Sequence, residues 1–506
     1  MRSALLSLLQ SPVLVAVVLI SGIGGTFQYG FHVSVLTSPS SYIKELVNST
    51  CVQRYGYALE PWELSLVWSF IVSLLCFGGM LGSLCATHLA SALGRKRCLL
   101  LNNVLAIAAA LLMILSKSAN SFELIMLGRF LSGINAGVSL TVHPMYLLEC
   151  TPRRLRALIG TSISSFLSLG KFFGQLLGIS ELLGTETLWP FLLAFSGLTA
   201  LLQLVCLPFL PESPRYLLLE REDASACEEA LRKLRGPHGH RLSEVKEMQM
   251  EQEDVQDVKN HGMLELLLER SVRWQLLTII VIFTTVQLCG INVVYLYSSD
   301  VFLAAGIPEY NLGYVTVGTG LCEFICSIFC GLLIESVGKK VVIVWGYFAM
   351  AATLLFLTIT LYLQAYVWWM PYCSMMLVFF FIASFCSGPN GVLPPLPSEI
   401  FTQSFQSAAF TLSNTLNWVG LISIGMVFPF IVACLDYFCF LVFFPFCLGT
   451  ALFVWFNVPE IKNRTVTEIS AEFDRMHGKA RDTTDTKLNA VHVAHVQTQI
   501  GLTTKF

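Results

Sequence analysis

The sequence predicts an all-α membrane protein with twelve transmembrane helices in two six-helix halves, joined by a helical linker. Composition, apolar stretches and an internal repeat each favour this fold. The chain has 506 residues, of which 55% are hydrophobic and only 13% are charged, with a mean hydropathy of +0.68. A typical soluble domain is about 25% charged. Composition alone therefore indicates a membrane protein, while the net charge of −2 is uninformative.

Twelve stretches are long and apolar enough to cross a bilayer, which takes roughly 20 mostly apolar residues. The first runs well beyond the apolar core of a signal peptide and no clear cleavage site follows, so we interpret it as a retained helix. The predicted spans lie near residues 11–36, 64–89, 98–116, 122–148, 157–179, 188–210, 272–302, 311–333, 341–363, 369–397, 405–434 and 437–457.

Three motifs recur in register between the two halves. "LGRKR" after the second span matches "VGKK" after the eighth, "LECTPRRLR" matches "PSEIFTQSFQS", and "LPESPR" matches "VPEIKN". Three matches at nearly one offset indicate parallel repeats, the layout of major facilitator transporters, which bind substrate between the halves near mid-membrane. The matching residues are Gly94 and Gly338, 244 positions apart, Glu149 and Glu399, 250 apart, and Glu212 and Glu460, 248 apart.

Lysine and arginine are unevenly shared between the short loops. They cluster after the second, fourth and eighth spans and are absent from the short loops after the fifth, seventh, ninth and eleventh. Because loops rich in Lys and Arg stay on the cytoplasmic side, both termini are expected in the cytoplasm. The protein itself is expected in the plasma membrane. Residues 37–63 then lie outside the cell, where Asn48 begins an Asn-Ser-Thr glycosylation pattern. The similar pattern at Asn463 falls inside and is discounted.

The segment between the sixth and seventh spans is charged and contains "ACEEALRKLRG" and "LSEVKEMQMEQEDVQ". Both stretches predict short amphipathic helices on the cytoplasmic surface. Residues 476–506 are polar and lack an apolar period, which is typical of a loose tail. The predicted organisation is an N-terminal half at 1–210, a cytoplasmic helical linker at 211–270, a C-terminal half at 271–458 and a cytoplasmic tail at 459–506.

Two amides stand inside the seventh span. Gln287 and Asn292 are five positions apart, about 140° on a regular helix at 100° per residue. They can face one cavity only if the helix loosens between them, which Gly290 permits. Amide side chains offer both donors and an acceptor to hydroxyl groups. The alternative is that they join helices through hydrogen bonds worth on the order of 0.6 kcal/mol each.

Several motifs resemble one family. "PESPRYLL" after the sixth span, "GRK" after the second, "GIN" in the seventh and "VPE" after the twelfth are similar to the sugar porter family, and more narrowly to the facilitative glucose (hexose) transporters. The resemblance covers roughly residues 11–470. "FQYG", "SFELIMLGR" and "GTGLCE" resemble the fructose-related class. Phe283-Thr284-Thr285 stands where glucose-selective members carry Gln-Leu-Ser.

The resemblance implies a hexose (glucose or fructose) uniporter that works by alternating access. It implies a functional monomer in lipid, without catalytic residues, cofactor, metal or nucleic-acid partner. An aromatic ring in such a site covers the C–H face of a sugar. Plain packing is the alternative for the residues outside the seventh and eighth spans. The implied substrate-binding residues are Gln28, Tyr29, Gln287, Asn292, Glu323, Asn417 and Trp418.

The departures from the family indicate a roomier pocket. Ser164, Val286 and Cys386 stand where glucose-selective members have Gln, Gln and Glu, and Pro394 replaces a tryptophan. Three polar ligands and one bulky wall are thus lost or reduced. The glucose contact set does not carry over, and the preferred hexose stays open.

Two charges within predicted spans are functional candidates, because ionisable residues are expensive in a membrane. Glu323, in place of a family asparagine, either binds a hydroxyl, carries a proton, pairs with Lys171, or is a protonated, hydrogen-bonded carboxyl. Lys171 extends toward a water-filled path. A third group, Cys322, Cys326 and Cys330, shares one helix face and is interpreted as small packing residues, because no histidine or fourth ligand lies near.

A set of charges lies where helix ends meet the inner surface. In the family, such residues form ion pairs that hold the outward-open state. The alternative is that they satisfy helix ends and the positive-inside rule. Gln406, Ala157 and Asn463 replace family residues and indicate a looser inner gate in the second half. The predicted gating residues are Arg95, Glu149, Arg156, Arg215, Glu335 and Glu399.

Two other functions are weighed against uniport. Proton-coupled sugar porters typically carry an aspartate in the first span, but residues 11–36 contain no Asp, Glu, Lys or Arg. Glu323 is the rival proton site. A non-transporting sugar sensor usually has a long tail, and the segment after the twelfth span is short. An enzyme is not expected, because the sequence contains no phosphate loop, metal cluster or nucleophile constellation.

Overall fold

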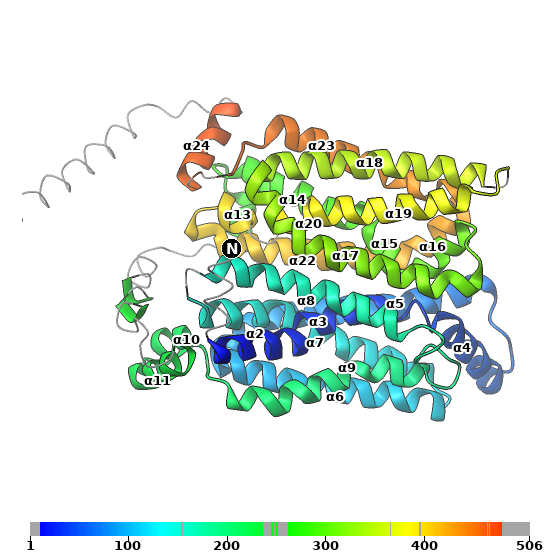
Figure 1. Ribbon diagram of the computed structural model, residues 1–506, viewed down its shortest axis with the longest axis horizontal. Helices are drawn as coiled ribbons and strands as arrows, with labels where there is room; N and C mark the ends of the chain where they lie inside the picture. Colours follow the sequence, from blue (N-terminus) through cyan, green and yellow to red (C-terminus); the bar gives the residue numbers. More distant parts are fainter. Residues whose placement is uncertain are drawn as a thin grey trace, which may run out of the picture.

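The computed structural model of the protein describes residues 11–152, 155–235, 244–246, 248–250, 262–364, 366–393, 396–462, 464 and 466–477. Every regular element in this part of the chain is a helix, and most long helices run along one axis of the bundle (Figure 1). The all-α fold is therefore confirmed. The second predicted linker helix and the tail beyond residue 477 lie largely outside the described residues.

The helices of the first half and the linker follow the predicted spans closely. The first span consists of two helices, α2 and α3. Their bounds are α2 (Pro12–Gly24), α3 (Thr26–Ser34), α4 (Ser40–Tyr55), α5 (Pro61–Leu93), α6 (Arg95–Ser118), α7 (Phe122–Cys150), α8 (Arg156–Leu177), α9 (Trp189–Cys206), η2 (Leu207–Phe209), α10 (Pro214–Leu219), α11 (Ala224–Arg235) and α13 (Met263–Leu268).

The second half contains more interruptions. The seventh predicted span is divided into three helices and the tenth likewise. The bounds are α14 (Arg273–Leu288), α15 (Ile291–Leu296), α16 (Ser298–Ala304), α17 (Glu309–Val337), α18 (Lys339–Leu363), α19 (Met370–Ser387), α20 (Pro389–Val392), α21 (Leu396–Ile400), α22 (Gln403–Leu435), η3 (Asp436–Val442), α23 (Phe444–Asn457) and α24 (Val466–Met476).

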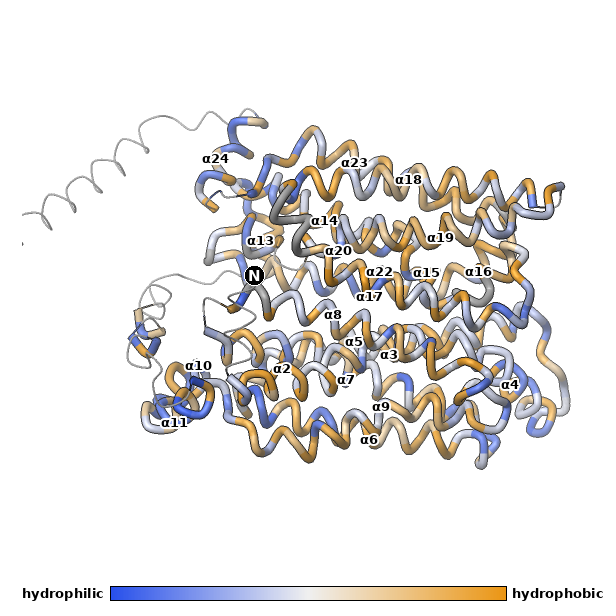
Figure 2. Tube along the Cα trace, in the orientation of Figure 1, coloured by the Kyte–Doolittle hydropathy of each residue, from blue (hydrophilic) through white to orange (hydrophobic). Residues whose placement is uncertain are grey.

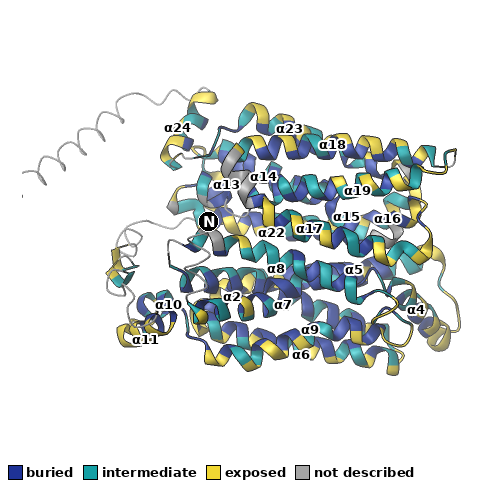
Figure 3. Ribbon diagram, viewed as in Figure 1, coloured by how far each residue is buried: buried dark blue, intermediate teal, exposed yellow. Residues whose placement is uncertain are grey.

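Eleven helical stretches in the described residues are long and apolar enough to cross a membrane. The predicted span that is not among these eleven is the fifth, which corresponds to α8, a helix of 22 residues that carries Lys171 and many serines and glycines. On the outside of the bundle, Leu101, Leu111 and Leu115 of α6 are 55%, 56% and 54% exposed. In Figures 2 and 3 the middle of the bundle is mostly apolar, and exposed residues lie on outward faces. Lipid is the solvent that fits such a surface.

The helices form two groups that meet along two long contacts. In Figure 1 the first half, blue to teal, lies below the second half, green to orange. α8 packs against α17, α5 packs against α22, and α15 touches α3. We call the end of the bundle that carries α4 the α4 end, and the end that carries α10, α11, α13 and α24 the linker end. The two-half fold predicted from the repeat is confirmed.

The recurring motifs correspond to one device used in both halves. Gly94 and Gly338 have positive φ angles of 93° and 104° and directly precede α6 and α18. Free N–H groups at a helix start need acceptors, and a glutamate from the third motif supplies one. The hydrogen bonds are Lys96 N to Glu212 Oε1 at 2.9 Å and Lys340 N to Glu460 Oε1 at 3.4 Å. The first and third recurring motifs thus form equivalent helix caps in the two halves, at the linker end.

The segment after the first span differs from prediction. The sequence analysis assigned no helix to residues 37–63, but α4 is a helix of 16 residues and Cys51 is buried in it. Ile43, Val47 and Cys51 recur every four residues and are buried on one face. This period was present in the sequence and predicts a helix. Its significance was missed because the segment as a whole is polar.

Candidate functional site

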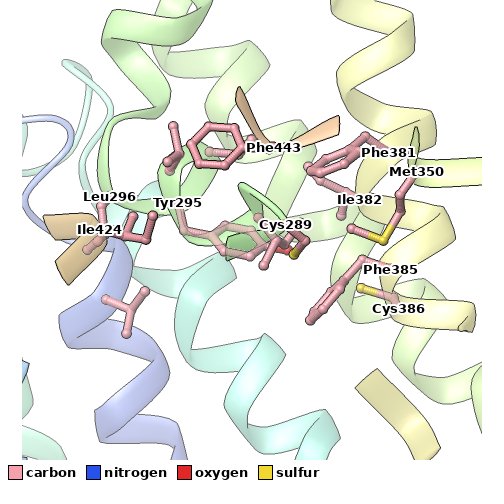
Figure 4. Packing of buried hydrophobic residues seen from close by; sticks show 14 of the residues in the cluster. Cys289, Tyr295, Leu296, Met350, Phe381, Ile382, Phe385, Cys386, Ile424 and Phe443 are labelled. Carbon is pink, nitrogen blue, oxygen red and sulfur yellow. The ribbon is translucent and has the colours of Figure 1, made fainter. Parts of the chain in front are cut away.

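The seventh span breaks where the sequence predicted. α14 ends at Leu288, Gly290 has a left-handed φ of 90°, and α15 begins at Ile291. A side chain at position 290 would place its Cβ 2.9 Å from the Phe443 ring. Figure 4 shows Cys289, Tyr295 and Leu296 in the apolar packing around this region, together with Phe443. Only glycine fits this conformation and this space without strain.

The break brings three amides together. Asn292 donates from Nδ2 to Gln287 Oε1 at 2.5 Å, and Gln287 donates from Nε2 to Asn417 Oδ1 at 2.5 Å. Gln287 is only 2% exposed, whereas Asn292 and Asn417 are half-buried. An amide has two N–H donors and a carbonyl acceptor, so these three residues retain further hydrogen-bonding positions. We call Gln287, Asn292 and Asn417 the amide cluster.

Two aromatic residues meet across the halves beside it. Trp418, next to Asn417 on α22, donates from Nε1 to Ser83 Oγ of α5 at 2.8 Å. The Tyr29 ring of α3 lies edge-on to Trp418, with centroids 5.8 Å apart and an interplanar angle of 77°. The structure therefore brings Tyr29 and Trp418 together from opposite halves. Ser83 was not predicted, because nothing in its local pattern identifies its partner.

Gln28 lies elsewhere. It is fully buried and donates from Nε2 to Thr199 Oγ1 of α9 at 3.4 Å, within the first half. The structure thus places Gln28 apart from the amide cluster, although Tyr29 follows it directly in sequence. Adjacent residues on a helix point in directions about 100° apart, and here Gln28 points toward α9 while Tyr29 points toward Trp418.

Glu323 and Lys171 form an ion pair between the halves. Lys171 Nζ of α8 lies 2.8 Å from Glu323 Oε1 of α17, and the two side chains are 8% and 1% exposed. Ser168 Oγ donates to the same oxygen at 3.3 Å. Lys171 Nζ also lies 3.8 Å from the centre of the Tyr295 ring. The sequence left several roles open for Glu323, and in the structure Glu323 is paired with Lys171.

Two further contacts join the halves nearer the α4 end, one from α8 and one from the turn that follows it, both to α17. Gln175 donates from Nε2 to Thr319 Oγ1 at 3.2 Å. The Tyr314 hydroxyl donates to Glu181 Oε1 at 2.7 Å, and this hydrogen bond is the main reason why the pKa of Glu181 lies below its usual value. With the Lys171–Glu323 pair, these contacts hold the halves together from mid-depth to the α4 end. None of the four residues was predicted from sequence.

Arg129 is a further buried charge within a predicted span. The sequence analysis singled out Lys171 and Glu323, but Arg129 in α7 is fully buried and donates from Nη1 to the His32 carbonyl at 2.7 Å. Its Nε and Nη2 atoms have no hydrogen-bond partner among the described residues. A charge in the middle of "LGRF" was visible in the sequence and was overlooked.

Three of the six predicted gating residues lie in two separate groups at the linker end. Arg95 Nε lies 3.0 Å from Glu149 Oε2, and Arg95 Nη2 lies 2.6 Å from Glu220 Oε1. Ser213 Oγ donates to Glu149 Oε2 at 2.5 Å. In the second half, Glu399 pairs with Lys339. Glu220, Ser213 and Lys339 were missed, because spacing along the chain does not identify partners on other helices.

The remaining gating residues are less informative. Arg156 is half-buried, and its Nε has no hydrogen-bond partner in the described part of the chain. Arg215 is half-buried and does have a polar interaction. The side chain of Glu335 lies outside the described residues, as do Pro394 and Asn463. Their assignment to a gate stays a prediction.

Two other predictions concern single features. Asn48 is half-buried on α4, and its Oδ1 accepts a hydrogen bond from Leu59 N at 3.0 Å.

Among the described residues, no three His, Cys, Asp or Glu side chains are placed to hold a metal ion. Cys322 instead lies 3.9 Å from the Phe379 carbonyl. Pockets of about 340 and 360 Å³ lie beside Lys96 at the linker end and beside Trp345 on α18, away from the amide cluster.

Comparison with known proteins agrees with this architecture. Residues 17–473 match the family model described as "Sugar (and other) transporter". The chain is 42% identical over 460 residues to solute carrier family 2, facilitated glucose transporter member 9 of Mus musculus, covering 91% of this chain and 85% of that protein. It is 41% identical over 474 residues to member 11 of the same family from Homo sapiens, covering 94% and 95%.

The fold also matches a solved structure. The xylose transporter XylE from E. coli, in an inward open conformation, superimposes with a TM-score of 0.74 at 21% identity, covering 91% of this chain and 99% of that one. At this identity the likeness concerns the fold alone. Together with the family match, it confirms the major facilitator fold and the family resemblance predicted from "PESPRYLL" and "GIN". The chain therefore belongs to the sugar (and other) transporter family, and it is a transporter rather than an enzyme.

Proposed function

We propose that this protein carries a hexose, glucose or fructose, down its gradient across the plasma membrane by alternating access, as a monomer. The observation that carries the proposal is the amide cluster beside a broken helix. Uncharged amides match sugar hydroxyls without the strong desolvation penalty of a charged site. The relatives described as facilitated glucose transporters support the substrate class and the absence of coupling.

The arrangement of the contacts suggests how the site opens. Gln175–Thr319 and Tyr314–Glu181 join the halves nearer the α4 end, whereas Lys171–Glu323 joins them at mid-depth. Opening toward the α4 end breaks the first two contacts, while the Lys171–Glu323 pair lies near the pivot and stays together. In this proposal the bound sugar replaces the hydrogen bonds that the amides make with one another, and the aromatic pair Tyr29 and Trp418 covers its apolar face.

Reconstitution tests the function directly. Purified protein in liposomes is expected to equilibrate labelled fructose or glucose, because a uniporter only lets its substrate run downhill. An imposed pH gradient is expected to drive no accumulation. The measurement is time-dependent uptake over a panel of hexoses, with protein-free liposomes as the control. Accumulation above the external concentration, driven by protons, would contradict uniport and make Glu323 the leading proton site.

Orientation is tested at Asn48. With the α4 end outside the cell and both termini in the cytoplasm, Asn48 lies on the side of the membrane where N-glycans are attached. Treatment of the cell-made protein with an N-glycan-removing enzyme is expected to increase its gel mobility, and Asn48→Gln is expected to abolish that shift. Ser49→Ala, which keeps the Asn-x-Thr pattern, is the matched control. A shift that survives Asn48→Gln would refute this acceptor.

Two alternatives remain as outcomes of these experiments. A symporter is disfavoured because residues 11–36 contain no acidic residue that could carry a proton. The buried Arg129 accordingly bonds the backbone carbonyl of His32 in this span and not a carboxylate. A sensor that binds sugar without moving it would show binding by protein fluorescence but no uptake into liposomes. The wild-type uptake assay separates both from a uniporter.

A further inference from the structure

The Lys171–Glu323 pair presents a physical problem for a transporter. Glu323 is a carboxyl group at mid-depth, fully buried, on the helix of one half. Its partner Lys171 belongs to the other half and is 2.8 Å away. A bare carboxylate in such a place is strongly disfavoured, and a buried carboxyl without a partner becomes neutral by taking up a proton.

The groups that surround the pair supply no second positive charge. They are tyrosines and cysteines, which are neutral or negative and never positive. Arg129, the next buried cation, donates to the His32 carbonyl instead. Among the described residues, Lys171 is therefore the cation that neutralises Glu323. The surrounding titratable groups are Tyr29 of α3, Tyr295 of α15, Cys322 and Cys326 of α17, and Cys386 of α19.

The geometry leaves a place where a proton could bind. Lys171 and Ser168 both contact Oε1 of Glu323. Oε2 is buried and accepts no hydrogen bond from Lys171 or Ser168, and the Tyr295 hydroxyl lies beside Glu323. Loss of the lysine charge would leave Oε2 free to be protonated with no other residue displaced.

We propose that Lys171 is a fixed substitute for a proton: its charge neutralises Glu323 through the whole transport cycle, so that the carrier changes conformation without taking up H⁺. Lys171 is thus a positioning and charge-compensating residue that determines uncoupled transport. This inference rests on the proposed function. It explains how a chain with a buried carboxyl between its halves can be a uniporter.

The central test is Lys171→Met in liposomes, which keeps the length of the side chain and removes its charge. Wild-type hexose uptake is expected to be flat between about pH 5.5 and about pH 8, whereas uptake by the variant falls as pH rises, by about tenfold per unit above the pKa of Glu323, because only the protonated form cycles. Proton entry with the sugar is followed at the same time with a pH-sensitive dye inside the vesicles.

Three further variants make the result specific. Lys171→Met with Glu323→Gln removes both charges and is expected to restore a flat pH profile. Glu323→Gln alone leaves a lysine to be neutralised, so its uptake is expected to rise with pH. Lys117→Met removes a half-buried lysine whose one side-chain hydrogen bond in the described structure goes to the Glu186 carbonyl, and it is expected to behave as wild type.

The outcomes separate the two proposals. If wild type moves no hexose, the proposed function fails before the pair is examined. If wild type transports and Lys171→Met has a flat pH profile, the substitute-proton role is refuted. If Lys171→Met does not reach the membrane, the Glu323→Gln profile decides, since a flat profile there would also refute it. A merely structural ion pair would lower the amount of folded protein without creating a pH dependence.

Discussion

Replacement of Gln287 by leucine is expected to lower the apparent hexose affinity about 5- to 150-fold while the protein still reaches the membrane. A buried hydroxyl that loses its partner costs roughly 1–3 kcal/mol, and each 1.4 kcal/mol is about tenfold in affinity. Gln287 is the centre of the amide cluster and bonds both Asn292 and Asn417. Asn292→Leu removes one of these bonds and leaves the other, so its effect is expected to be smaller.

The measurement is concentration-dependent uptake, together with surface labelling. Asn103→Leu is the control, because Asn103 is a fully buried amide that bonds Gln203 inside the first half, at 2.7 Å. This control is expected to lower the amount of folded protein and leave the affinity of the surviving protein unchanged. If the two cluster variants behaved like the control, the amides would be joining helices rather than binding sugar.

Gly290→Val is expected to slow turnover by about 5- to 30-fold with a smaller change in apparent affinity. A non-glycine residue in a left-handed conformation costs roughly 1–2 kcal/mol, a free energy that corresponds to that range. The added side chain also meets Phe443. The seventh span then favours a continuous helix, and the conformational change that depends on the break becomes slower. Gly290→Ala is expected to lie between wild type and valine.

The readouts are the maximal rate, the half-saturating concentration and the thermal unfolding midpoint. Gly56→Val is a suitable control, since Gly56 has a φ of 78° but nothing within 4 Å of its added Cβ. It carries the same backbone strain in the connection after α4, far from the break. Both variants are expected to lose stability, but only Gly290→Val is expected to lose turnover rate. Equal turnover in the two would show that the break has no role in the cycle.

Much of the fold was predictable because its signals are local. Length and hydropathy located the spans, and a loosening of the helix at Gly290 followed from one glycine between two amides. The repeat was detected from letters alone, although its cause, glutamate caps on α6 and α18, became visible only in three dimensions. α4 was missed because its apolar residues are few and its overall composition is polar.

Partners were the part that sequence could not supply. Lys171 and Glu323 are 152 positions apart, and spacing along the chain does not say which helix faces which. The same limit explains why Glu220 was missed as a partner of Arg95. It also explains Gln28, whose neighbour Tyr29 meets Trp418 while Gln28 itself contacts Thr199. A helical period predicts the direction of a side chain, but not what stands opposite.

The two glutamate caps determine what salt can change at the linker end. Ion pairs at a surface are weakened when ionic strength rises, and this applies to the partly exposed pair of Lys339 with Glu399. A carboxylate that bonds backbone N–H groups belongs to the secondary structure itself, because it completes a helix end. High salt is therefore expected to weaken the side-chain ion pairs at this end. The hydrogen bonds from the first turns of α6 and α18 to Glu212 and Glu460 are expected to persist. Each half then keeps its internal structure at high salt, and in the proposed cycle the two halves still move as rigid bodies.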